Sequence, residues 1–180
     1  MNALIYIIGT LTSLYLAVLM LRLIMQIVRV DFRNPFAEAV VRLTNPLVMP
    51  LRRVLRPVGK LDTASVVAIV LFALFKVVVE WSLLHRSWPD PASWIIATCF
   101  EIVIALLWLY VIMIFFYGIA GFLMQGGSSP IYEVLAYVCD PLLNRIRKII
   151  PSIVAGLDLS FLWAIIALQA LIILIGEIRL

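Results

Sequence analysis

Three ionisable residues interrupt stretches of the sequence that are otherwise almost wholly apolar. Lys76 and Glu80 are four residues apart and therefore share one face of a helix, and Glu101 lies in the next apolar stretch. At ~1.5 Å of helical rise per residue, all three lie roughly 7–13 Å from the outer ends of those stretches. Ionisable residues inside a membrane are costly and count as candidates for a functional site. We interpret the cluster as a structural ion pair between two helices, with an ion or proton pathway as the alternative.

Side chains that commonly take part in catalysis or metal binding are few in the rest of the sequence. The chain has one histidine and two cysteines. We place Cys99 inside an apolar stretch and Cys139 in a basic loop, and neither a disulfide nor a metal site is expected from this pattern. The single His85 lies at the end of an apolar stretch, without a nucleophile or a paired acid and base. The sequence therefore predicts a protein that is not an enzyme and that binds no cofactor or metal ion.

The composition is typical of a membrane protein. Hydrophobic residues make up 65% of the chain and charged residues 13%, and the mean hydropathy is +1.15. About 18 apolar residues are enough to cross the hydrocarbon core as a helix. Four stretches qualify, at about 3–28, 64–84, 94–124 and 159–178. We predict an all-α membrane protein with about four transmembrane helices.

Basic residues in the connections predict the orientation, because Lys and Arg near the ends of spans stay on the cytoplasmic side. The first and third connections carry nearly all of them, whereas the short second connection carries only Arg86. The first and third connections are therefore predicted to be cytoplasmic, with both termini outside. Arg22 lies near the cytoplasmic end of the first span, and we expect it to snorkel to the surface.

The two cytoplasmic connections repeat each other at a constant spacing. A shift of 95 residues relates Pro35 to Pro130, Pro46 to Pro141, and Arg52 to Arg147. Asp62 recurs as Asp158 after one inserted residue, and each is expected to cap the span that follows. We predict two repeats, residues 1–90 and 91–180, each with two of the four spans. Because each repeat has an even number of spans, the two run in parallel across the membrane.

Within each connection a polar residue twice precedes proline. The four pairs are Asn34-Pro35, Asn45-Pro46, Ser129-Pro130 and Asp140-Pro141. Each predicts a helix start, because the side chain caps an orphan N–H and proline is tolerated at the first helical position. Pro50 is expected to kink or delay the helix after Asn45.

The segments after Asn45 and Asp140 alternate apolar and basic residues at helical spacing. We predict amphipathic helices on the cytoplasmic membrane surface. Each basic charge near an anionic surface is worth about 1 kcal/mol. The candidates for binding anionic lipid or a partner are Arg52, Arg53, Arg56, Arg145, Arg147 and Lys148. The alternative is that these residues only enforce the topology.

Two segments of the chain resemble the YggT family of integral membrane proteins. They are NPFAEAVVRLTNPLVMPLRRVL followed by LDTAS, and SPIYEVLAYVCDPLLNRIRKIIP followed by LDLS. The resemblance covers nearly all of the chain, although Ser65 and Ser160 lack the proline expected after each serine. It implies a multi-spanning protein of the bacterial plasma (inner) membrane, with plastid relatives. It also implies roles in osmotic-stress tolerance, potassium supply, assembly of membrane complexes or cell division, without catalytic residues.

Two functions from different classes remain open. The first is a scaffold or assembly factor, whose expected partners are the bilayer, anionic lipid headgroups, and a membrane protein or a second copy of the chain, but not nucleic acid. The alternative is a protein related to potassium transport that supports osmotic tolerance. A pore needs polar residues through its full depth, whereas the inner parts of these spans are almost wholly apolar. This difference favours the scaffold.

Overall fold

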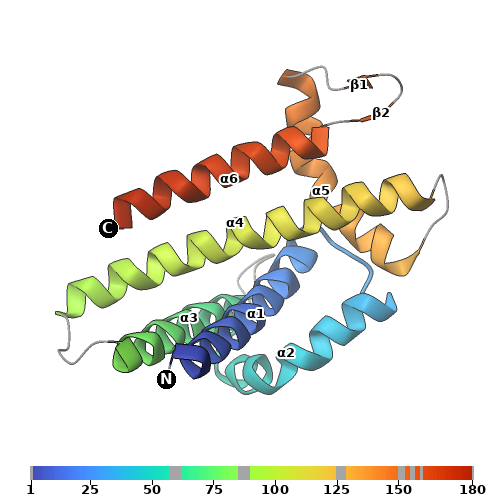
Figure 1. Cartoon of the computed structure of the whole chain (residues 1–180). Helices are drawn as coiled ribbons and strands as arrows, with labels where there is room; N and C mark the ends of the chain where they lie inside the picture. The colour runs from blue at the N-terminus through green and yellow to red at the C-terminus, as the bar shows by residue number, and fades with distance from the viewer. Residues whose placement is uncertain are drawn as a thin grey trace. The chain divides into compact units, whose positions relative to one another are not determined.

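A computed structural model describes residues 2–56, 62–84, 90–124, 129–149, 153–154, 157–158 and 160–179. Within them the fold is helical, which confirms the all-α prediction (Figure 1). The helices are α1 (Asn2–Ile27), α2 (Pro35–Val54), α3 (Thr63–Leu84), α4 (Pro91–Met124), α5 (Pro130–Ile149) and α6 (Ser160–Arg179). Two short strands, β1 (Ile153–Val154) and β2 (Leu157–Asp158), pair antiparallel. Predictions that concern His85 and Arg86 fall outside the described residues.

Four of these helices are long and apolar enough to cross a membrane. The candidate spans are Ala3–Ile27, Thr63–Leu83, Pro91–Leu123 and Ser160–Glu177, within a few residues of the predicted stretches. Large apolar side chains are exposed along all four, as contact with lipid requires; examples are Leu11, Phe75, Phe116 and Ile173. The prediction of a multi-pass helical membrane protein therefore agrees with the fold.

α4 also begins at a polar residue followed by proline, but this helix start was not among the four predicted ones. Asp90 precedes Pro91, and its carboxylate accepts a hydrogen bond from the Ser93 hydroxyl at 2.6 Å. This hydrogen bond is the main reason that the pKa of Asp90 is lowered. The dipeptide Asp90-Pro91 was the available signal, and it places the helix start three residues before the predicted span.

Contacts between Cα atoms divide the chain into two compact units. One comprises Met1–Leu23 and Val40–Leu106, and the other Ile24–Ala39 and Leu107–Leu180. Small residues at helical spacing, Ala64 and Ala68, form part of the buried face of α3 in the first unit. In the second unit, Val134 and Val138 are buried on one face of α5. The units are defined by packing, so the division into sequence repeats at residue 90 stays a prediction.

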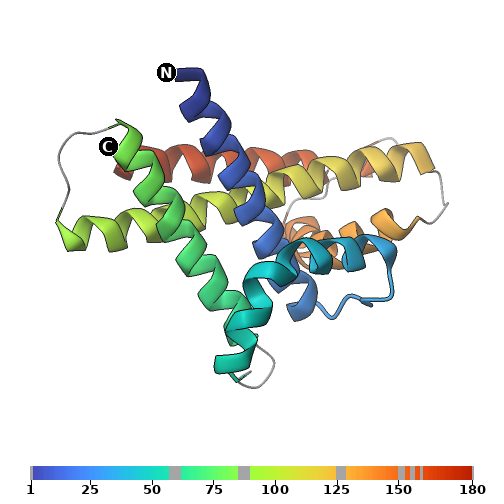
Figure 2. The same ribbon diagram turned by 90° about the horizontal axis from the view of Figure 1, so that it is seen from below.

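Two of the four predicted helix starts are wrong. α2 begins at Pro35 and continues through Pro46 and Pro50, and α5 begins at Pro130 and continues through Pro141. An interior proline removes a backbone hydrogen bond and crowds the preceding turn, so a helix that contains one bends unless it ends. Figure 2 shows α2 changing direction near its middle. The Asn45-Pro46 and Asp140-Pro141 pairs therefore mark bends, and not starts.

The other two starts are confirmed. Asn34 Oδ1 accepts a hydrogen bond from the backbone N–H of Phe36 at 2.9 Å. Ser129 Oγ accepts one from the N–H of Tyr132 at 3.1 Å. In both cases the polar side chain satisfies a donor of the first turn that has no partner within the helix.

Candidate functional site

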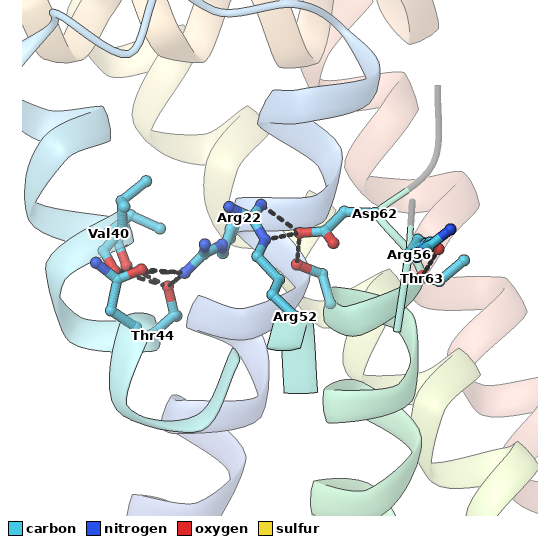
Figure 3. Close-up of polar contacts among 10 residues, drawn as sticks. Arg22, Val40, Thr44, Arg52, Arg56, Asp62 and Thr63 are labelled. Carbon is cyan, nitrogen blue, oxygen red and sulfur yellow. Dashed lines mark hydrogen bonds and ion pairs between the residues drawn. The ribbon is translucent and has the colours of Figure 1, made fainter. Parts of the chain in front are cut away.

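Arg22 of α1 lies against the bend of α2. Its side chain is buried, with 3% of the residue exposed. Its Nη1 donates hydrogen bonds to Thr44 Oγ1 at 2.7 Å, to Asn45 Oδ1 at 3.0 Å and to the Val41 carbonyl at 3.4 Å. Figure 3 shows the guanidinium pointing from α1 toward Thr44. The prediction that Arg22 snorkels to the surface is wrong, because the turn before Pro46 offers it buried acceptors.

Thr44 links this arginine to the backbone of the bend. Its hydroxyl donates to the carbonyls of Val40 at 2.7 Å and Val41 at 3.1 Å, while it accepts from Arg22. The carbonyl four residues before an interior proline loses its donor, since proline supplies none. Pro46 removes the donor of the Arg42 carbonyl, whereas Arg22 and Thr44 bond to the carbonyls of the turn just before it. They brace this turn and do not replace the missing bond.

Arg52 fixes the basic end of α2 to the start of α3. Its Nε and Nη2 donate to Asp62 Oδ2 at 3.0 Å and 2.5 Å, and Ser65 donates to the same oxygen at 2.7 Å. Burial of Asp62 opposes its ionisation, but the hydrogen bonds from Arg52 and Ser65 and the charges of Arg52 and Arg22 outweigh it. The pKa of Asp62 is therefore lowered. Figure 3 shows this ion pair beside Arg22.

Arg147, which the shift of 95 relates to Arg52, has a similar place in the other unit. Its Nε donates to the Ser160 hydroxyl at 3.3 Å, and its Nη1 donates to Asn144 Oδ1 at 2.9 Å. Ser160 is 1% exposed. Asp158 belongs to β2 by its backbone, but its side chain lies outside the described part of the structure.

All six basic candidates are exposed residues, including Arg52, whose side chain is 50% exposed. The other four lie near Arg52 and Arg147 in the sequence. They are Arg53 and Arg56 after the bend of α2, and Arg145 and Lys148 after the bend of α5. Among the described residues, none of the four forms an ion pair. Each half of the chain therefore has three exposed basic candidates, of which one arginine, Arg52 or Arg147, is bonded to the start of the next spanning helix.

The bend of α5 also has a donor from a spanning helix. Tyr117 of α4 donates its hydroxyl to Asp140 Oδ1 at 2.9 Å, and its ring stacks on Tyr132 with centroids 5.3 Å apart. The shift that relates Pro46 to Pro141 also relates Arg22 to Tyr117. Sequence analysis missed both donors, although each lies at the same distance before the proline.

Cys139 lies in α5 and not in a loop, which corrects the prediction for this residue. It is fully buried. Burial, and then the charge of Asp140, raise the pKa of its thiol to about 12. The thiolate form is therefore suppressed at neutral pH, and the side chain packs as a small apolar group.

The three predicted intramembrane charges lie together. Lys76 Nζ forms a short hydrogen bond with Glu101 Oε1 and lies 3.5 Å from Glu80 Oε1. The side chains of Lys76 and Glu101 are 7% and 8% exposed, and that of Glu80 is 29% exposed. The ammonium group thus joins α3 to α4, which is the geometry expected of a structural ion pair. Within the described residues, no group of three His, Cys, Asp or Glu side chains is placed to hold a metal ion.

Comparison with known proteins places the chain in a family. The family model described as CCB3/YggT matches residues 1–83 and 90–178. A protein of Pseudomonas aeruginosa is 35% identical over 97% of this chain and 88% of its own length. The YggT protein of Escherichia coli is 33% identical over 99% of this chain and 92% of its own length.

A third relative, from Vibrio alginolyticus, is 37% identical over 99% of this chain and 96% of its own length. All three relatives are described as uncharacterised proteins. No solved structure is significantly similar to the chain. The match to the family model and the identities over nearly full length show that the chain belongs to the CCB3/YggT family.

Proposed function

We propose that the protein is a non-enzymatic scaffold of the bacterial inner membrane that binds anionic lipid headgroups or a membrane protein through the basic ends of α2 and α5. One observation carries this proposal. In each half a single arginine, Arg52 or Arg147, is bonded to the start of the following spanning helix. The neighbouring basic side chains remain exposed.

The internal bonds of Arg52 and Arg147 tie the basic helix ends to the next spanning helices, so the neighbouring charges project from a held backbone. A charged group held by the fold loses less conformational freedom on binding than the same group on a flexible loop. Arg53, Arg56, Arg145 and Lys148 together offer an anionic surface about 4 kcal/mol, at ~1 kcal/mol for each charge. This amount is sufficient to select among lipids or to hold a partner at the cytoplasmic face.

The alternative role in potassium transport and osmotic tolerance would have to use the intramembrane charges. Lys76 is bonded to Glu101 and lies near Glu80, so its charge is already compensated by neighbours. Such compensation supports the structural interpretation of the cluster. The scaffold proposal therefore rests on the basic helix ends, and not on Lys76.

A charge-neutral variant tests the scaffold proposal. Arg53, Arg56, Arg145 and Lys148 are changed together to Gln, and the matched control exchanges Lys and Arg at the same positions. Purification in mild detergent, followed by mass spectrometry of bound lipid and protein, should show at least a tenfold loss of anionic lipid or of a stoichiometric partner in the Gln variant alone. Equal retention by both variants, with unchanged topology, would exclude the proposed binding role.

A further inference from the structure

A groove runs along α5 beside the segment that follows α1. Its wider part has a volume of about 560 Å³ and is lined by Val28, Tyr132, Glu133 and Asp140 among others. Its narrower part has a volume of about 230 Å³ and is lined by Asp31, Arg33 and Asn34 among others. Glu133 and Tyr137 line both parts. We name this feature the α5 groove. The wider part alone falls in the range of ~300–1,000 Å³ typical of small-ligand sites.

The walls of the α5 groove are held by contacts within the chain. Asn34 Nδ2 donates to the carbonyl of Pro130 at 2.7 Å, which ties the start of α2 to the start of α5. Tyr117 donates to Asp140 and stacks on Tyr132. These bonds fix side chains on both sides of the groove without a ligand, and pre-organisation of this kind lowers the cost of binding.

The two parts of the groove carry different charges. The charged residues that line the wider part are the carboxylates Glu133 and Asp140. The narrower part adds the guanidinium of Arg33, the amide of Asn34 and a third carboxylate, that of Asp31, which accepts a hydrogen bond from the backbone N–H of Arg33 at 2.9 Å. A cation is therefore favoured in the wider part, and an anion is favoured only near Arg33. This arrangement fits a ligand that carries both charges.

The groove lies at the level where a spanning helix ends. Val28 lines it and directly follows the candidate span Ala3–Ile27. A lipid whose acyl chains remain in the hydrocarbon region can therefore place its headgroup in the groove. Val28 and Ala136 provide apolar lining in the same part.

We propose that the α5 groove binds the phosphoethanolamine headgroup of a zwitterionic phospholipid. The ammonium group lies between Glu133 and Asp140, and the phosphate lies at Arg33 and Asn34. A guanidinium matches the geometry of phosphate oxygens, and an exposed aromatic ring such as that of Tyr137 adds attraction for a cation.

The lining favours a primary over a quaternary ammonium group. A primary ammonium donates three hydrogen bonds, and Glu133, Asp140 and Asn144 offer acceptors for them. A quaternary ammonium depends on a cage of several aromatic rings. The ring of Tyr132 is stacked on Tyr117, and the single ring of Tyr137 does not make a cage. The groove should therefore prefer phosphatidylethanolamine to phosphatidylcholine. This inference does not depend on the proposed scaffold function, which uses other residues.

Lipid retention by the full-length protein tests the inference. The protein is reconstituted with equal amounts of phosphatidylethanolamine, phosphatidylcholine and phosphatidylglycerol, extracted in mild detergent and weighed by native mass spectrometry. Wild type and the control Glu177→Gln should retain phosphatidylethanolamine at least fivefold over phosphatidylcholine. Glu133→Gln combined with Asp140→Asn should abolish this preference, and Arg33→Gln should weaken retention of both zwitterionic lipids.

Two further outcomes separate the possible explanations. Soluble phosphoethanolamine at millimolar concentration should displace the bound lipid. Binding of the soluble compound without any retention of phosphatidylethanolamine would contradict a lipid ligand. Equal retention of phosphatidylethanolamine and phosphatidylcholine by wild type overturns the proposal, however the variants behave. The Gln variant of Arg53, Arg56, Arg145 and Lys148 should keep the preference for phosphatidylethanolamine. Failure of the scaffold function can therefore be distinguished from failure of the groove proposal.

Discussion

The two halves of the chain place a side-chain donor at the same position before an interior proline, but with different chemistry. In the first half, buried Arg22 bonds to three acceptors beside Pro46. In the second half, Tyr117 bonds to Asp140 beside Pro141. An interior proline removes one backbone donor from each helix, and in each half the added side-chain bond lies at the residue just before that proline. The comparison shows that the position of the donor is retained while its charge is not.

The charge of the first donor changes what surrounds it. A buried guanidinium needs nearby negative charge or several acceptors, and the electrostatic influence of Arg22 reaches Asp62, which also binds Arg52. Tyr117 is neutral and needs only one acceptor. The first half therefore has a connected network of charges near its bend, whereas the second half has a local hydrogen bond and an aromatic stack.

The largest effect is expected at Lys76. The second half of the chain has apolar residues at the corresponding positions, so this buried charge is a feature of the first half alone. Lys76→Met should destabilise the protein by about 3–5 kcal/mol, since it leaves Glu101 buried without its cation. Lys76→Met combined with Glu101→Leu should recover most of this loss. The amount of folded protein in membranes and the thermal midpoint in detergent measure both effects.

A well-folded double variant should also retain any osmotic-tolerance phenotype. Loss of that phenotype without loss of fold would show that the Lys76 cluster is a functional ion or proton site. In that case the halves would differ in activity, and not only in stability.

Removal of the charged donor at the first bend should have the next largest effect. Arg22→Met should cost about 3 kcal/mol, because hydrogen bonds to a charged group are worth ~1.5–3 kcal/mol and Asn45 and Val41 lose a partner. The thermal midpoint in mild detergent gives the measurement. A cost below that of Tyr117→Phe would show that Arg22 does not support the bend.

Removal of the neutral donor at the second bend should cost less. Tyr117→Phe keeps the stacked ring and removes one hydroxyl, so we expect a loss of about 1 kcal/mol. The same thermal assay compares it with Arg22→Met. Tyr110→Phe in the same helix is a matched control, because the hydroxyl that donates to Asp140 is that of Tyr117. It should be close to neutral.

The smallest effect is expected from acid, which should destabilise the first half of the chain more than the second. The folded pKa of Asp62 lies below the unfolded value of about 3.9. Its contribution to stability is therefore complete above that value and is lost as the pH falls through the folded pKa. The thermal midpoint of wild type should fall more steeply below about pH 4 than that of Asp62→Asn. Arg147→Gln should leave the acid dependence unchanged, since Arg147 bonds to a hydroxyl.

The sequence predicted the spans and two helix starts well, because long apolar stretches and capping residues are local signals. It failed at Asn45 and Asp140, where the local pattern is the same but the helix continues. In both places a side chain of a spanning helix, Arg22 or Tyr117, bonds to the residue before the proline, and no local rule reveals such a contact. The α5 groove was missed for the same reason, since Arg33 and Glu133 are brought together only by folding.

Site-directed cysteine labelling in intact bacteria tests the central claim, that α2 and α5 both lie on the cytoplasmic side of the membrane, most directly. In a variant without native cysteines, single probes replace Val54 at the end of α2, Ile131 in α5 and Ala92 in α4, all exposed in the structure. A membrane-impermeant reagent should label the probe at Ala92 in intact cells, and those at Val54 and Ile131 only after permeabilisation. Labelling of Val54 or Ile131 from outside would contradict the account.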